Sequence, residues 1–176
     1  FKKSVDEKSI AVLPFDNYST AEEDQYFSDG MTEVIIANLA KVKDLKVISR
    51  TSVMEYKNTT KKLRDIAEEL GVANILEGSI QRSNGRVRVV GQLIDADTDE
   101  HIWAETYDRE ESDLFELQSS IAIEIAGAMK SELTTDEKAR INEVLTESTA
   151  AYEYYLKGNM FDHAGHSDCL LYTSPS

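Results

Sequence analysis

Basic residues are scarce in this chain of 176 residues. Lysine and arginine number 19 against 33 aspartates and glutamates, so the formal net charge is −14. Nucleic-acid phosphates require a basic surface, and anionic membranes attract one. The composition therefore speaks against nucleic acid or an anionic membrane as a direct partner of this segment, and it is typical of an acidic globular domain.

Long apolar runs are also missing. A helix needs about 20 consecutive apolar residues to cross a bilayer, and the chain has no such run. It begins at Phe1 rather than at a methionine, so we expect a fragment of a longer protein. Any signal peptide or membrane anchor would lie upstream of it.

Cysteine occurs once, as Cys169, in the final octapeptide 169–176. The natural back-translation of this octapeptide resembles a transposon-type sequencing adapter. We interpret it as an adapter read through as protein, so the cysteine says nothing about redox compartment. The same interpretation removes a superficial metal cluster of His163, His166 and Cys169. Resequencing the locus is expected to give a longer native reading frame without the octapeptide.

Motifs for nucleotides and nucleophiles are absent as well. No G-x-G-x-x-G or P-loop pattern is present, so we expect no nucleotide-phosphate site and no cofactor. The sequence Glu77-Gly78-Ser79 departs from the G-x-S-x-G pattern of a nucleophile elbow. Gly78 is better explained by a bulge or a close helix approach within a strand.

One acidic stretch resembles the start of a calcium-binding loop. It contains Asp95, Asp97, Asp99 and Glu100, but Glu100 stands where an EF-hand needs glycine. Thr106 stands where the same loop needs its final glutamate. We therefore expect a solvated hairpin turn and no metal site, with a weak calcium contact as the alternative.

What the chain does contain is a strong signal for a three-stranded antiparallel meander. Asn84-Gly85 separates two β-rich runs, and both residues tolerate the positive φ of a tight hairpin turn. Alternate residues from Val87 to Leu93 fall on one face of the second run, as expected for a half-buried strand. The three strands are predicted at residues 74–82, 86–95 and 101–108.

The rest of the chain predicts helices and short strands around this meander. An apolar run forms the first strand, with Pro14 at its end because proline cannot donate to a ladder. Ser28 or Asp29 is expected to cap the first helix, Gly71 to close the second, and Asp113 with Glu116 to form a capping box on the third. The predicted elements are a strand at 9–15, a polar loop at 16–29, a helix from 30 to 42, a strand at 45–49, a polar segment at 51–62 anchored by Val53, Met54 and Tyr56, a helix at 63–70, a helix at 112–133 and a helix at 136–145.

These elements predict an α/β fold with a mixed five-stranded sheet in the order β-α-β-α-β-β-β-α. The early strand–helix alternation favours parallel pairing through right-handed crossovers, while the meander has to be antiparallel. We divide the chain into a linker at 1–8, an α/β domain at 9–133, a connector at 134–149 and the start of a helical repeat at 150–168, followed by the adapter-like octapeptide.

The polar loop 16–29 is the leading candidate for a binding site. It leaves the carboxyl end of the first strand, where open α/β sheets usually bind ligands, and long loops there are often functional. The candidate residues for binding a ligand or partner are Asp16, Asn17, Tyr26, Phe27 and Asp29. The structural alternative is that Tyr26 and Phe27 pack the loop onto the sheet while Ser28 and Asp29 cap the helix.

Two further groups of residues are candidates for a site. His101 shares a strand face with Trp103 and Tyr107, and it would favour acid–base chemistry only if a nucleophile and an orienting group converged on it. Core packing explains the two aromatic residues better. Arg82, Arg86 and Arg88 form the one basic cluster, for which salt bridges to neighbouring acids are the simpler use.

Five ordered motifs carry a family resemblance across about residues 8–133. They are Ser9-Ile-Ala-Val-Leu-Pro-Phe-Asp-Asn17, Tyr26-Phe-Ser-Asp-Gly-Met-Thr-Glu33, Leu76-Glu-Gly-Ser79, Gln92-Leu-Ile-Asp95 and His101-Ile-Trp-Ala-Glu-Thr-Tyr-Asp-Arg109. Together they resemble the TolB amino-terminal-domain-like family. A later stretch, with Tyr152, Tyr155 and Gly158, is similar to the first helix of a tetratricopeptide repeat.

The resemblance implies a non-enzymatic sensor or protein-interaction domain in a membrane-anchored bacterial signalling or transcription-regulatory protein. The domain would lie on the periplasmic, extracytoplasmic side and bind a protein partner or a small ligand in the cell envelope, with tetratricopeptide repeats after it. Its output module, outside this fragment, would be a winged-helix regulator, a nucleotide cyclase or a kinase. The alternative is an envelope assembly or scaffold protein without an effector module, and a hydrolytic enzyme is a third hypothesis.

Overall fold

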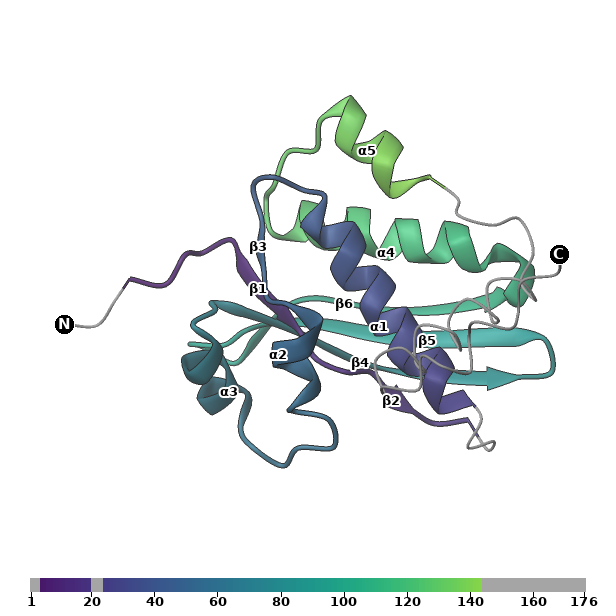
Figure 1. Cartoon of the computed structure of the whole chain (residues 1–176), viewed down its shortest axis with the longest axis horizontal. Coiled ribbons are helices and arrows are strands. Elements are labelled where there is room, and N and C mark those ends of the chain that lie inside the picture. Colours follow the sequence, from purple (N-terminus) through teal and green to yellow (C-terminus); the bar gives the residue numbers. More distant parts are fainter. Residues whose placement is uncertain (1–3, 20–23, 144–176) are drawn as a thin grey trace, which may run out of the picture.

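Three long antiparallel strands form the central and outer part of the sheet, as the alternating pattern predicted. They are β4 (Asn74–Ser83), β5 (Arg86–Asp95) and β6 (Glu100–Glu110). The β4–β5 turn places Asn84 at φ 52° and Gly85 at φ 75°, which is the conformation that makes Asn-Gly a hairpin sequence. The structure, a computed structural model, describes residues 4–19 and 24–143 (Figure 1).

The remaining strands are short. Their pairings with one another and with β4 are all parallel. The strand order is β3-β1-β4-β5-β6, where β1 is Ser9–Val12 and β3 is Lys46–Val47. The mixed α/β sheet is thus confirmed, but it has six strands rather than five. The extra strand, β2 (Asp16–Asn17), pairs with β4 at Ser79 and Ile80. Pro14 interrupts the first strand because it has no N–H, and pairing resumes two residues later.

The helices lie on both faces of this sheet. Tyr107 of β6 donates its hydroxyl hydrogen bond to Glu124, which places α4 on one face. Gln118 of α4 donates to the Met31 sulfur, so α1 lies beside α4 on that face, as Figure 1 shows. Helix α3 packs near β4 on the opposite face. The helices are α1 (Gln25–Ala40), α2 (Arg50–Met54), α3 (Leu63–Leu70), α4 (Leu114–Ala128) and α5 (Thr135–Ile141), with a short 3-10 helix, η2 (Glu111–Asp113), before α4.

Several predicted helix limits were wrong. Helix α1 begins at Gln25, so Ser28 and Asp29 lie inside it and cap nothing. The reason is that Tyr26 and Phe27 are buried and extend the apolar side of the helix by one turn. Helix α4 ends at Ala128 rather than 133, because Lys130 adopts the left-handed φ of 58°.

The predicted helix caps are only partly confirmed. Gly71 closes α3 at φ 70°, as expected. Asp113 precedes α4 but its side chain makes no capping hydrogen bond, so the predicted capping box is wrong. The chain forms its capping box at α5 instead, between Thr134 and Glu137. Helix α2 was not predicted, although Val53, one of the three expected anchors, is buried in it.

Gly78 marks a close approach rather than a bulge. The β4–β5 ladder runs through it without interruption and pairs it with Gly91. A Cβ atom on Gly78 would lie 2.1 Å from the Val90 carbonyl oxygen and 3.0 Å from the Phe15 ring. We predicted that a helix would approach Gly78, but the Phe15 side chain covers the sheet at this position instead.

Helix α5 is held against the sheet-packing helices by a buried carboxylate. Glu137 is only 4% exposed, and it accepts hydrogen bonds from the Lys43 N–H at 2.9 Å and the Thr134 N–H at 3.2 Å. Ser119 of α4 also donates to the Ile141 carbonyl at 3.1 Å. These backbone donors, with Lys43 the larger contributor, lower the pKa of Glu137.

This contact predicts a pH-dependent loss of stability. Glu137→Gln is expected to destabilise the protein at pH 7, because the variant loses the charge that the two N–H groups favour. A lowered pKa in the folded state gives stability that is present above the unfolded pKa and disappears as the pH falls. The difference in unfolding free energy should therefore shrink as the pH drops below about 4.5. Urea denaturation over pH 3 to 7 tests this, with Asp136→Asn, exposed on the same helix, as the control. A pH-independent difference would contradict it.

None of the helices in the described ranges is long and apolar enough to cross a membrane. The predicted repeat at 150–168, the octapeptide 169–176 and the end of the connector, residues 144–149, lie outside the described residues.

Candidate functional site

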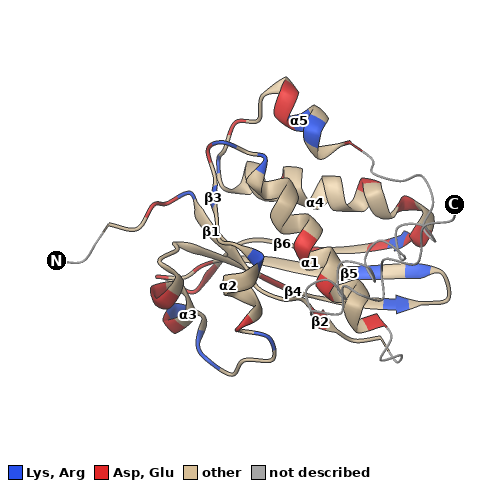
Figure 2. Ribbon diagram, in the orientation of Figure 1, with Lys and Arg blue, Asp and Glu red and all other residues tan. Residues whose placement is uncertain are grey.

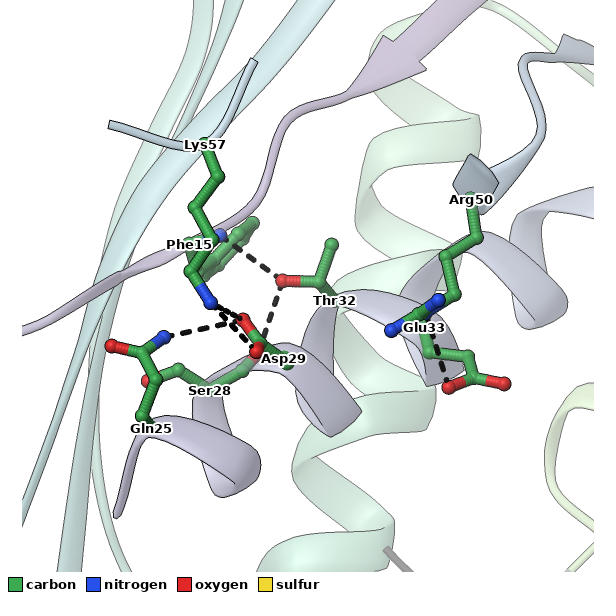
Figure 3. Close-up of polar contacts among 8 residues, drawn as sticks. All are labelled: Phe15, Gln25, Ser28, Asp29, Thr32, Glu33, Arg50 and Lys57. Atoms are coloured by element: carbon green, nitrogen blue, oxygen red, sulfur yellow. Dashed lines mark hydrogen bonds and ion pairs between the residues drawn. The ribbon is translucent and has the colours of Figure 1, made fainter. Parts of the chain in front are cut away.

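Asp29, one of the predicted site residues, forms an ion pair with Lys57. The Lys57 ammonium donates to its two carboxylate oxygens at 2.8 and 3.0 Å, and the Gln25 amide donates at 3.2 Å (Figure 3). Lys57 comes from the segment after α2, so the contact ties that segment to the first turns of α1. Asp29 is thus engaged within the fold rather than directed at an empty site.

Tyr26 and Phe27 lie in the core, as the structural alternative proposed. Phe27 is 0% exposed, and the Arg82 guanidinium lies 5.0 Å from its ring centroid. Arg82 in turn donates to Glu111 at 2.6 Å and to Asp24 at 3.3 Å. The aromatic pair and its arginine cover therefore fasten α1 to β4.

A chain of hydrogen bonds joins the segment after β1 to α1. The Phe15 N–H donates to the Thr32 hydroxyl at 3.0 Å, and that hydroxyl donates to the Ser28 carbonyl at 3.0 Å. Figure 3 shows these groups beside the separate Arg50–Glu33 ion pair, at 3.4 Å. The segment that carries Asp16 and Asn17 is fixed from this side.

The five predicted residues are not gathered at one place. The Asn17 side chain accepts a hydrogen bond from the Ser19 N–H at 2.9 Å and shapes its own turn. Asp16 is exposed and lines a cleft on the other side of the sheet from α1. Asp16 is therefore the one member of the set that the structure places on this cleft, and a binding role for all five stays a prediction.

The ion pair at Asp29 gives a measurable expectation. Asp29→Asn should lower the free energy of unfolding by about 1 kcal/mol, since the pair is only partly shielded from water. Lys57→Met should cost a similar amount, and the double variant should cost less than the sum of the two. Chemical denaturation of all four proteins gives the coupling energy, and strict additivity would show that the pair does not stabilise the fold.

The cleft beside Asp16 has a volume of about 280 Å³ and lies on the sheet face opposite α4. Its floor is formed by Glu77 and Ser79 of β4 with Val90 and Gln92 of β5. These are the alternate residues that point away from the α1–α4 side. The walls come from two segments distant in sequence, which are residues 13–18 on one side and residues 58–66, with Lys61 and Ile66, on the other.

The cleft carries uncompensated negative charge. In the described part of the chain, neither Glu77 nor Asp16 forms an ion pair or a side-chain hydrogen bond. Lys61 is the one basic residue in the lining, and its ammonium is 2.7 Å from Glu69. Burial, and secondly the charge of Asp16, raise the pKa of Glu77. The cleft therefore presents carboxylates that its own walls do not neutralise.

The other groups weighed from the sequence have structural partners. His101 Nε2 lies 2.7 Å from the Gln92 amide oxygen, which also belongs to a cleft residue. Arg86 and Arg88 both pair with Asp108, at 2.8 and 3.3 Å, as the salt-bridge interpretation predicted. Figure 2 shows this basic group on the strands next to the β4–β5 turn.

The suspected calcium loop forms the predicted hairpin turn. Asp95 accepts hydrogen bonds from the Asp97 and Thr98 N–H groups at 2.9 and 3.2 Å. Asp99 adopts a φ of 61° in the same turn. Within residues 4–19 and 24–143, no three His, Cys, Asp or Glu side chains gather closely enough to hold a metal ion.

Sequence reasoning missed Glu77, Ser79 and Gln92 as floor residues. The available signal was the polarity of Glu77 and Ser79 on one face of a strand whose other face is apolar. In an antiparallel strand that face normally meets solvent, so the pattern predicted exposure and not a cleft. The walls could not be predicted because segments 13–18 and 58–66 are distant in sequence and are brought together only by the fold.

Comparison with known proteins gives a matching family and a longer relative. Residues 6–124 match the family described as the HilA/YgeH-like transcriptional regulator, second domain. A Rhizobium meliloti (strain 1021) protein, provisionally named adenylate cyclase 3, is 47% identical over 132 residues. That match covers 75% of this chain but 22% of the relative, so the chain spans about a fifth of the relative's length.

Two solved structures share the fold at low sequence identity. Lipoprotein GNA1162 from Neisseria meningitidis has a TM-score of 0.52 at 19% identity, over 68% of this chain and 96% of its own. TolB from Acinetobacter baumannii has a TM-score of 0.52 at 16% identity, over 73% of this chain and 30% of its own. At these identities the likeness concerns the fold alone. The resemblance to TolB is thus supported at the level of the fold, while the matched family is that of the HilA/YgeH-like regulators.

Proposed function

The chain belongs to the HilA/YgeH-like transcriptional regulator second-domain family, and from this premise we propose that it is a non-enzymatic sensor or protein-interaction domain of a bacterial signalling protein. The observation that carries the proposal is its relation to a much longer relative. The 47% identical protein is named for a cyclase, and this domain accounts for only 22% of it. A module that recurs in proteins named for different outputs is suited to input rather than to either output.

The proposed site of input is the cleft on the open sheet face. Its floor stands on β4 and β5, two long strands that are paired along their whole length, so its geometry is fixed by a rigid element. Its walls come from the residues around Asp16 and from residues 58–66, which comprise the end of the α2–α3 segment and the start of α3. A ligand that contacts both walls would bind one relative arrangement of these segments better than another, which is how binding shifts a conformational equilibrium.

The proposed location is the periplasmic side of a membrane-anchored protein. The TolB-like resemblance of the sequence supports this, and so does the fold shared with a lipoprotein. Within this proposal, Asp16 contacts the ligand or partner, and Asn17, Tyr26, Phe27 and Asp29 shape the support behind it. Tetratricopeptide repeats would follow residue 150, and an anchor and effector would precede the fragment.

An envelope scaffold is the second candidate, and one observation favours it. Lipoprotein GNA1162 is covered over 96% of its length, so in that protein the same fold stands with little else attached. A domain of this kind would act as a docking platform without an effector. The two candidate functions require the same fold. They differ in whether the gene also encodes an effector module.

Recovering the complete native gene separates them. The signalling proposal expects a reading frame that also encodes a transmembrane segment and a DNA-binding, cyclase or kinase module. A frame that encodes a secretion signal and this domain, with repeats but no effector, would overturn it and leave the scaffold. A reporter fusion at the domain then tests whether it lies on the extracytoplasmic side.

A further inference from the structure

The carboxylates of the cleft on the open sheet face favour cationic ligands. Its floor and one wall present the carboxylates of Glu77 and Asp16, while the ammonium of Lys61 is drawn away by Glu69. A cleft lined by one sign of charge concentrates ligands of the opposite sign. Among the remaining polar groups of the floor, the Ser79 hydroxyl supplies a hydrogen-bond acceptor that an N–H group can use, while the Gln92 amide oxygen is already in contact with His101.

The size and the rim of the cleft restrict the ligand further. A volume of about 280 Å³ is near the lower end of small-molecule pockets, so it suits one compact polar group. Tyr18 lines the cleft and is 65% exposed, so its ring is accessible to a ligand. An aromatic face beside carboxylates is the environment in which organic cations bind.

We propose that this cleft binds an alkylammonium or guanidinium group, with Glu77 and Asp16 as its counter-charges and Tyr18 over its apolar stem. The cation is either a free small amine or the side chain of a lysine or arginine in a peptide. A divalent metal fits less well, because Ca²⁺ and Mg²⁺ require about six oxygen ligands and the cleft offers two carboxylates. This inference rests on the proposed sensor function and names the chemistry of its ligand.

Glu77 in this position is expected to lower the stability of the fold, which a residue with a purely structural role would not do. It is half-buried in a strand and forms no ion pair in the described part of the chain. Burial raises its pKa and so disfavours its ionised form, and the charge of His101 opposes this only in part. Replacing it with glutamine should therefore raise the melting temperature at pH 7. Residues that lower stability while serving a site are typical of binding surfaces.

The test is an NMR titration of the ¹⁵N-labelled 176-residue chain. The probes are agmatine and putrescine as free cations, and N-acetyl-lysine methylamide and N-acetyl-arginine methylamide as peptide side chains. Succinate is the anionic control. We expect both cation chemistries to shift the amide signals of β4 and β5 around Glu77 and Gln92 with dissociation constants of about 1 mM or tighter. Preference for the amide-capped probes would indicate a peptide source, and preference for agmatine or putrescine a free amine.

Variants make the result specific. Glu77→Gln and Asp16→Asn should each weaken cation binding about tenfold, while Glu116→Gln, an exposed acid on α4, should leave it unchanged. A raised melting temperature in Glu77→Gln would show that the variant is folded. Absence of shifts with every cation, or equal binding by wild type and both cleft variants, would overturn the inference. That failure is distinct from failure of the sensor function, which depends on the effector encoded in the full gene.

Discussion

Gly78→Ala is expected to lower the free energy of unfolding by about 3 kcal/mol, because the added methyl group has no space. Its Cβ would lie 2.1 Å from the Val90 carbonyl oxygen, which is part of the paired backbone and is unable to move without opening the β4–β5 ladder. The Phe15 ring, at 3.0 Å, closes the other side. Urea denaturation monitored by circular dichroism measures the loss.

Gly127→Ala is the matched control for that substitution. It lies in α4, and a Cβ there would meet no atom of the described chain within 4 Å, apart from its own helix and neighbours. Alanine is favoured over glycine in helices, so this variant should gain up to about 1 kcal/mol. A Gly78→Ala protein as stable as wild type would show that β4 and β5 are not paired at this position as described.

Phe27→Ala should cost about 4 kcal/mol, the amount typical of removing a fully buried phenylalanine. The ring is 0% exposed and lies under the Arg82 guanidinium, so truncation leaves a cavity between α1 and β4 and removes the arginine's apolar support. The same substitution at an exposed recognition residue would change stability by less than about 0.5 kcal/mol. Thermal and urea denaturation therefore separate the core role from a surface role.

Tyr18→Ala supplies the comparison within the same stretch of sequence. Its side chain is 65% exposed, so its removal should leave the unfolding free energy within about 0.5 kcal/mol of wild type. Equal costs for the two aromatic residues would contradict the placement of Phe27 in the core.

The parts of the fold that were predictable are those encoded by local sequence. The β4–β5 hairpin follows from Asn84-Gly85 and from alternation that is readable within ten residues. Helix α3 and its Gly71 cap follow in the same way. The parallel pairing of β1 followed from the order of the elements along the chain.

The parts that were not predictable depend on contacts between distant segments. Strand β2 has two residues and exists because β4 offers an unpaired edge beyond the end of β1. Helix α1 begins early because Tyr26 and Phe27 are buried, with Phe27 under Arg82, and no local pattern near them encodes this. Tertiary packing overrides local capping preference in such cases.

The candidate site shows the same division. Asp16 was predicted from its position after the first strand, and it does line the cleft. Glu77, Ser79 and Gln92 were not predicted, because a polar residue on an outward strand face has the same sequence signature whether water or a cleft covers it. The second wall comes from residues 58–66, over 40 positions further along the chain than Asp16.

Occupancy of this cleft is proposed to change the output of an attached module, and an assay of the full-length protein can measure this change. The protein encoded by the recovered gene would be expressed in its host, and its output measured for wild type, Glu77→Gln, Asp16→Asn and the control Glu116→Gln. The account predicts that both cleft variants shift the output by about fivefold or more, the range of ordinary allosteric coupling, while the control matches wild type. Cleft variants that match the control at equal protein levels would contradict it.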